Sequence, residues 1–191
     1  MTIPPWTEVQ LAVGGALRLA CGDRRALAFF DTSIDGFWRS FRAAAICYPM
    51  YLLLLSFRVS AAHWSQSGVP VVVIVETIAY VISWVAFPLL ILPLARWVGR
   101  EDRFLAFMVV YNWSQIPQTV LFVLVALDGA TGLLAASALQ FAQLAATIAV
   151  LVYEWYIARV ALTVTGAQAG VVVMADLVLG SLLGRLAVSL Y

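Results

Sequence analysis

The sequence predicts an all-α membrane protein: a polytopic bundle of five transmembrane helices, preceded by a helical segment at the cytoplasmic interface. Of its 191 residues, 64% are hydrophobic and 11% are charged, and its mean hydropathy is +0.98. Soluble domains of this length do not reach such values. Each of five apolar runs is long enough for a bilayer core about 30 Å thick, which needs roughly 20 residues per helix. The runs are too uniformly apolar to give a soluble bundle its polar outer faces.

The five runs define the predicted membrane domain, residues 38–191. They cover residues 40–57, 70–95, 104–127, 132–157 and 168–188. The first run is the shortest and begins behind Arg39 and Arg42. The second and fourth runs are long enough to tilt within the bilayer or to extend into the headgroup region.

Residues 1–37 form a separate N-terminal segment that is less apolar than the rest. Trp6, Val9, Val13 and Leu17 recur at helical spacing in it, which predicts an amphipathic helix on the membrane surface. A docking helix for a partner protein is the alternative interpretation.

The distribution of arginine predicts the orientation, because cytoplasmic flanks of membrane spans retain positive charge. All eleven basic residues are arginines. With the N-terminus in the cytoplasm, only Arg58 and Arg185 lie outside, and the other nine lie on the cytoplasmic side. We therefore expect a bacterial inner (cytoplasmic) membrane protein with a cytoplasmic N-terminus.

Composition and motifs argue against several functions. A net charge of +1 gives no basic field for nucleic acid. The cysteines, Cys21 and Cys47, and the only histidine, His63, form no metal-binding or catalytic cluster in the sequence. We expect no enzyme, no metal and no cofactor. The predicted partner is the lipid bilayer, and both a homo-oligomer and a larger membrane assembly are left open.

Three carboxylic acids lie inside the predicted spans, where ionisable groups are expensive to bury and therefore point to function. They are Glu76, Glu154 and Asp176. At 1.5 Å per residue, Glu76 lies roughly 10 Å below the outer surface and Asp176 roughly 12 Å above the inner surface. No arginine is expected within the spans opposite these acids.

Other polar residues share helix faces with these acids and form polar seams along four of the spans. At 100° per residue the seams contain Glu76, Tyr80 and Ser83 on the second span, Asn112, Gln115 and Thr119 on the third, Gln140, Gln143, Thr147 and Glu154 on the fourth, and Asp176, Gly180 and Gly184 on the fifth. The candidate polar site consists of Glu76, Asn112, Gln115, Gln143, Glu154 and Asp176. Gly180 and Gly184 form a GxxxG pattern, which predicts close helix packing.

Two interpretations fit the seams. In the first, they hydrogen-bond the helices together, each bond contributing on the order of 1 kcal/mol. In the second, they line a hydrated path for protons or a polar solute. Because few carboxylates are present and no buried arginine is expected, the leading prediction is a non-enzymatic protein that organises, scaffolds or accompanies other membrane components. A small transporter or channel is the alternative, and an accessory subunit of a larger assembly is a third.

Three short strings carry a family resemblance. They are Gly36–Arg42 (GFWRSFR), Tyr111–Ser114 (YNWS) and Val152–Arg159 (VYEWYIAR). Together with the five-span layout, they resemble the bacterial branch of the Yip-domain membrane proteins. Eukaryotic Yip proteins take part in membrane traffic and interact with Rab-type GTPases, but this chain lacks their long acidic N-terminal region. The resemblance therefore implies the fold, and it assigns neither an activity nor a site residue.

Overall fold

The computed structural model describes residues 5–191, and every regular element in that range is a helix. The elements are α1 (Pro5–Ala20), η1 (Arg24–Phe29), α2 (Ile34–Ser40), α3 (Arg42–Arg58), α4 (Ala61–Ser67), α5 (Val69–Trp97), η2 (Glu101–Arg103), α6 (Phe104–Thr131), α7 (Ala136–Ala161) and α8 (Gly166–Val188). Within the described residues, five helical stretches are long and apolar enough to cross a membrane. The prediction of an all-α bundle with five such helices is confirmed.

The helix boundaries differ from the predicted ones mainly between the third and fourth spans. Helix α6 continues to Thr131, and Gly132 ends it in the left-handed conformation with φ of 68°. The fourth span therefore begins at Ala136 rather than at residue 132. Helix α8 begins at Gly166, two residues before the predicted start, because Thr165 and Gln168 form a capping box.

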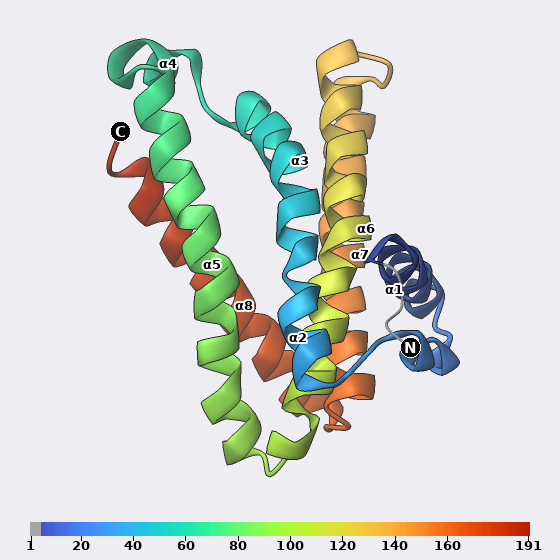
Figure 1. The fold of residues 1–191 in the computed structure, drawn as a ribbon. Coiled ribbons are helices and arrows are strands. Elements are labelled where there is room, and N and C mark those ends of the chain that lie inside the picture. Colours follow the sequence, from blue (N-terminus) through green and yellow to red (C-terminus); the bar gives the residue numbers. More distant parts are fainter. Residues whose placement is uncertain (1–4) are drawn as a thin grey trace.

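The five spans divide into two groups that meet at one end of the bundle (Figure 1). Helix α6 packs against both α3 and α7, whereas α5 packs mainly against α8. Helix α8 also contacts α7, and from that contact it diverges toward the α4 end (Figure 1). The bundle is consequently closed at the end where α7 leads into α8 and splayed at the α4 end.

The closed end holds the hydrophobic core. Its buried side chains include Phe87, Phe107, Ile157 and Val172, which come from α5, α6, α7 and α8. Many apolar side chains on the outer faces of α5, α7 and α8 are exposed. Such an outer surface is expected of helices whose solvent is hydrocarbon.

Helix α1 packs against α6, a contact that the sequence did not predict. Its buried apolar side chains are Ala12, Ala16 and Leu19, whereas Trp6 is 69% exposed and Leu17 is 52% exposed. Alanines lie at the contact because their small side chains let two helix backbones approach closely. Trp6 and Leu17 are left on the outer face, where they are available to a membrane surface.

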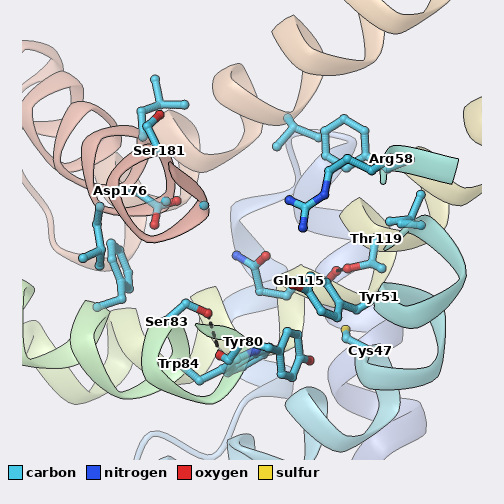
Figure 2. Close-up of a pocket in the computed structure, with 18 of the residues that line it drawn as sticks. Cys47, Tyr51, Arg58, Tyr80, Ser83, Trp84, Gln115, Thr119, Asp176 and Ser181 are labelled. Carbon is cyan, nitrogen blue, oxygen red and sulfur yellow. Dashed lines mark hydrogen bonds between the residues drawn. The ribbon is translucent and has the colours of Figure 1, made fainter. Parts of the chain in front are cut away.

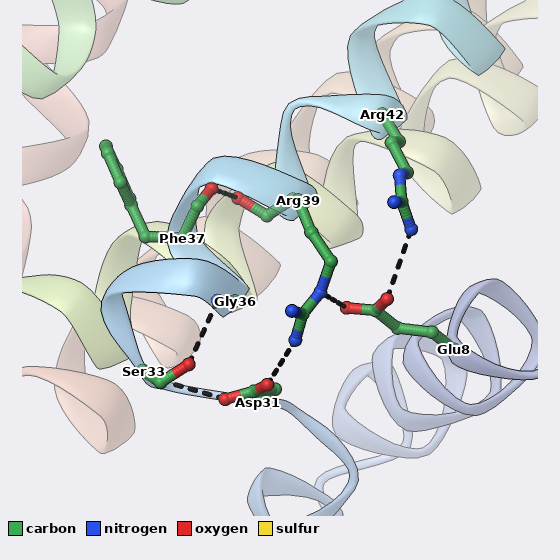
Figure 3. Close-up of polar contacts among 8 residues, drawn as sticks. Glu8, Asp31, Ser33, Gly36, Phe37, Arg39 and Arg42 are labelled. Carbon is green, nitrogen blue, oxygen red and sulfur yellow. Dashed lines mark hydrogen bonds and ion pairs between the residues drawn. The ribbon is translucent and has the colours of Figure 1, made fainter. Parts of the chain in front are cut away.

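Ion pairs attach α1 to the start of the first span (Figure 3). The Glu8 carboxylate accepts hydrogen bonds from Arg39 Nε at 2.9 Å and from Arg42 Nη1 at 3.2 Å. Arg39 also donates to the Asp31 carboxylate. We call these four residues the N-terminal clamp.

The turn before α2 places Asp31 in this clamp. The backbone N–H of Ser33 donates to Asp31 Oδ1 at 3.0 Å, and Ser33 Oγ accepts from Gly36 N–H at 3.0 Å. A Cβ atom on Gly36 would lie 1.9 Å from the Asp31 carbonyl oxygen, so only glycine fits there. The hydrogen bonds with Ser33 and the charge of Arg39 hold the pKa of Asp31 below its usual value.

Candidate functional site

A cleft of about 1130 Å³ separates the α5–α8 pair from the group formed by α3, α6 and α7. At the α4 end its lining includes Ser60, His63 and Tyr191, and at the deep end it includes Phe87, Glu154 and Asp176. Figure 2 shows side chains from both groups around this space, with Asp176 on one side and Gln115 and Arg58 on the other. The polar seams thus surround a cleft along part of their length.

Two carboxylic acids, Glu154 and Asp176, lie at the deep end, and we call them the acid pair. Glu154 is only 8% exposed, and none of the side-chain hydrogen bonds among residues 5–191 involves it. Asp176 accepts one hydrogen bond, from Tyr111 Oη at 2.9 Å. The two carboxyl groups are close enough to interact electrostatically. No arginine of the described chain forms an ion pair with either of them.

Gln115 adds an unsatisfied polar group to the same space. Its side chain extends from α6 into the cleft (Figure 2), near Glu154. The Gln115 Nε2 atom is buried and has no hydrogen-bond partner. A buried donor without a partner costs about 1–3 kcal/mol, so a bound water or solute that accepted from this amide would be stabilised.

At the α4 end, the Glu76 carboxylate is surrounded by hydrogen-bond donors, unlike the acid pair. It is 1% exposed, and three donors reach its carboxylate: Arg58 Nη2 at 2.6 Å, Tyr51 Oη at 2.5 Å and Tyr191 Oη at 2.6 Å. We call these four residues the latch, because they join α3, α5 and the residues after α8. The expectation that no arginine opposes the acids is wrong for Glu76, because Arg58 extends from the end of α3 to reach it.

Tyr191 is held in the latch by contacts beyond Glu76. Ser67 Oγ donates to the Tyr191 carbonyl at 2.6 Å, and the ring of His63 packs edge-on against the tyrosine ring. Burial and the hydrogen bond to Glu76 raise the pKa of Tyr191 to about 12. The phenol therefore stays a donor to Glu76 over the physiological pH range.

The structure brings most of the predicted site residues together. Asn112, Gln115, Glu154 and Asp176 line the cleft, and Glu76 lies in the latch at its edge. Asn112 Nδ2 also donates to Ser40 Oγ at 2.8 Å, which ties α6 to the end of α2.

Gln143 and the GxxxG glycines do not take the predicted positions. Gln143 is exposed and is not part of the cleft lining, because α8 diverges from α7 before reaching it (Figure 1). Gly180 and Gly184 line the cleft, and a Cβ at either would have no atom within 4 Å. The close helix packing predicted for these glycines is not made among residues 5–191.

Sequence reasoning missed the tyrosines and Arg58. Tyr51 and Arg58 are seven residues apart on α3, a spacing that places both on one helix face. That periodicity could have indicated the latch. Tyr111 precedes the predicted Asn112 directly, but nothing in the sequence pairs it with Asp176. Tyr191 carries no signal, because its contacts depend on the tertiary fold alone.

The chemistry available at the deep end is the binding of a proton or a cation. Two carboxyl groups in a low-dielectric site repel each other when both are ionised, and a shared proton or a bound cation relieves that repulsion. In residues 5–191, no group of three or more His, Cys, Asp or Glu side chains is arranged to hold a metal ion.

Comparison with known proteins adds no relative: no family model, no curated protein and no solved structure matches this chain. The resemblance to the Yip-domain proteins therefore stays a prediction.

Proposed function

We propose that this chain is a small membrane transporter that binds a proton or a small polar cation at the acid pair. The observation that carries the proposal is Glu154, a carboxyl group that is only 8% exposed, forms none of the side-chain hydrogen bonds among residues 5–191 and lies in a cleft beside the Gln115 amide and a second acid. A group in that environment is poorly explained as a helix-packing contact. Hydrogen-bonded seams stabilise a bundle only when their polar groups are paired.

The shape of the cleft favours a transporter over an open channel. Beyond the acid pair, the packed core around Phe107, Ile157 and Val172 fills the closed end. Phe87 stacks on Tyr111 with ring centroids 4.2 Å apart, directly at the cleft floor. A solute that enters from the α4 end can reach the acids, but the Phe87–Tyr111 stack and the core behind it block its way to the other side of the membrane. These residues would have to rearrange before the solute could cross. Movement of the α5–α8 pair relative to the other spans would provide this rearrangement, in the manner of alternating access.

The test is ion and proton flux into liposomes that contain the purified protein. Glu154→Gln and Asp176→Asn should each abolish a flux that is saturable in the wild type, because each removes one member of the acid pair. Glu101→Gln is the matched control, since it removes an exposed carboxylate in η2, which is remote from the acid pair in the sequence. Absence of flux above empty liposomes, with protein shown to be folded, would overturn the proposal, as would equal loss of flux in the control.

We further propose that the protein resides in the inner membrane of a bacterium, with its N-terminus and the α1 segment on the cytoplasmic side. The arginine distribution supports this orientation. Cys21 is exposed whereas Cys47 is buried, so a membrane-impermeant maleimide reports on the position of Cys21. In intact spheroplasts Cys21 should be protected, and permeabilisation should expose it. Labelling of intact spheroplasts would reverse the proposed orientation.

A role in organising other membrane components is the second candidate, and the outer face of α1 favours it. Trp6 and Leu17 are exposed there, and Trp38 near the clamp is exposed as well. These apolar side chains could contact either lipid or a partner protein. Native mass spectrometry after gentle solubilisation should detect a stoichiometric partner if this role is correct, and Trp6→Ser should release it. A monomer or homodimer without a partner would count against it.

A further inference from the structure

A second, smaller pocket lies at the closed end of the bundle, on the side away from the cleft. It has a volume of about 290 Å³ and is lined by Arg24, Leu27, Arg159, Val160, Thr163 and Val164. Arg24 begins η1, Arg159 lies in the last turn of α7, and Thr163 lies in the turn that leads to α8. Residues far apart in the sequence thus bring two arginines to one pocket.

A hydrogen bond between α7 and the turn before η1 helps to hold Arg24 at the same pocket as Arg159. Tyr156 Oη donates to the Gly22 carbonyl at 2.7 Å, which fastens the turn before η1 to α7. The neighbouring Asp23 cannot neutralise Arg24, because its carboxylate accepts from Arg18 at 2.5 and 3.0 Å and from the Arg25 N–H at 3.0 Å.

Neither pocket arginine has a carboxylate partner among residues 5–191. By contrast, Arg96 near this end of the bundle pairs with Glu101, and Arg103 pairs with Asp102. The positive charge of the pocket is therefore available to an anion. Two guanidinium forks match the oxygens of a phosphate group better than other cationic side chains do.

Thr163 contributes a hydroxyl group to this pocket at a position that favours glycine. Its φ is 54°, in the left-handed region, and it is the one non-glycine residue with positive φ in the described chain. That conformation is unfavourable for a β-branched side chain. Retaining threonine there keeps a hydrogen-bond donor in the pocket.

The depth of the pocket along the spans indicates where such an anion comes from. Helix α7 ends at Ala161 and α8 begins at Gly166, so the pocket lies where two membrane-spanning helices reach the headgroup layer. Arg159 stacks over Trp155 with its Cζ 5.3 Å from the ring centroid, and tryptophan favours that layer. Leu27, Val160 and Val164 add an apolar wall that an ionic ligand without an apolar part would not use.

We propose that this pocket binds the phosphate of an anionic phospholipid headgroup, held by Arg24 and Arg159 with Thr163 as a further donor. The site is separate from the acid pair. Loss of solute flux would leave lipid binding at this pocket untouched, and loss of lipid binding would not argue against transport.

The experiment titrates phosphatidylglycerol into the full chain in detergent and counts bound lipid by native mass spectrometry. Arg24→Gln and Arg159→Gln should each weaken binding on the order of fivefold, as expected for one arginine near an anionic headgroup, and the double variant should bind no better than background. Arg159→Lys keeps the charge but loses the planar fork, so an intermediate affinity is expected. It also keeps the proposal testable if the glutamine variants fold poorly.

Arg100→Gln is the matched control. Arg100 lies in the loop between α5 and η2, is exposed, and has no carboxylate partner among residues 5–191. The control should bind phosphatidylglycerol as the wild type does. Equal weakening in the control would mean that net charge rather than the pocket attracts lipid, and it would overturn the proposal. Inorganic phosphate should not displace the lipid, since it makes no use of the apolar wall. Full displacement would assign the pocket to free phosphate and overturn the lipid assignment.

Discussion

Glu76 in the latch and Glu154 in the acid pair are both buried carboxyl groups, yet their environments are opposite. Glu76 in the latch accepts hydrogen bonds from three donors, whereas Glu154 forms no side-chain hydrogen bond among the described residues and Asp176 forms one. A buried carboxylate with its full set of donors stabilises the contact between the elements that supply them. One without donors is a net cost to folding, and proteins retain such groups mainly where function needs them. The comparison separates a structural acid from a candidate functional pair.

The largest loss of stability is expected from adding a side chain at Gly36, which lies against the backbone of Asp31 in the N-terminal clamp. Gly36→Ala places a Cβ 1.9 Å from the Asp31 carbonyl, so the turn must shift and the N-terminal clamp must open. We expect a loss of about 3 kcal/mol in stability, at the upper end of overpacking effects. Thermal unfolding in detergent measures it. Gly14→Ala on α1, where a Cβ has open space, should be neutral or stabilising, and similar losses in both variants would contradict the steric argument.

Removing the cation from the latch should have the next largest effect. Arg58→Met leaves Glu76 buried without its ion-pair partner. We expect a loss of about 2 kcal/mol, less than the roughly 3–5 kcal/mol for a fully buried pair, because the Arg58 side chain is 52% exposed. The double variant Arg58→Met, Glu76→Met should recover most of that stability. A double variant that is no more stable than Arg58→Met would show that the unpaired charge of Glu76 does not cause the loss of stability.

The acid pair should respond in the opposite direction. Glu154→Gln removes a carboxyl group that forms no side-chain hydrogen bond among the described residues. We therefore expect the free energy of unfolding to stay unchanged or to rise by about 1 kcal/mol. The flux should be lost. Unfolding and flux measured on the same preparation test both parts. A large loss of stability in Glu154→Gln would instead make the acid pair structural, as Glu76 is.

The smallest effect is expected at the exposed edge of the N-terminal clamp. Asp31→Asn removes one partner of Arg39, and exposed ion pairs contribute less than about 1 kcal/mol. The pKa of Asp31 is lowered from 3.8 in the folded protein, so its contribution is present above pH 3.8 and is lost as the pH falls below that value. Hydrogen exchange of the α1 amides across this range should show an acid-induced loosening in the wild type. The loosening should be smaller in Asp31→Asn.

Much of the fold could be predicted from the sequence, because a span is a local property of about 20 consecutive residues. The five runs, the acids within them and the seams on α6 and α8 all follow from hydropathy and helical periodicity. The seam on α7 was predicted only in part, because periodicity shows that Gln143 and Glu154 share a face but not how far along the helix a neighbour extends. The α1 contact through Ala12 and Ala16 was missed for a related reason: hydropathy favours large side chains, whereas close helix packing favours small ones.

By itself, the sequence determined the helical class, the number of spans and the identity of the acids placed in them, since each depends on composition and on spacing along one helix. The tertiary structure alone decided which acid is neutralised. Arg58 lies 18 residues before Glu76 and Tyr191 lies 115 residues after it, so only the packing of α3, α5 and α8 brings them together. The same packing leaves Glu154 and Asp176 without an ion pair among residues 5–191, although Arg58 and Arg185 line the same cleft. The partners of a buried charge are set by three-dimensional proximity, which spacing along a single helix does not record.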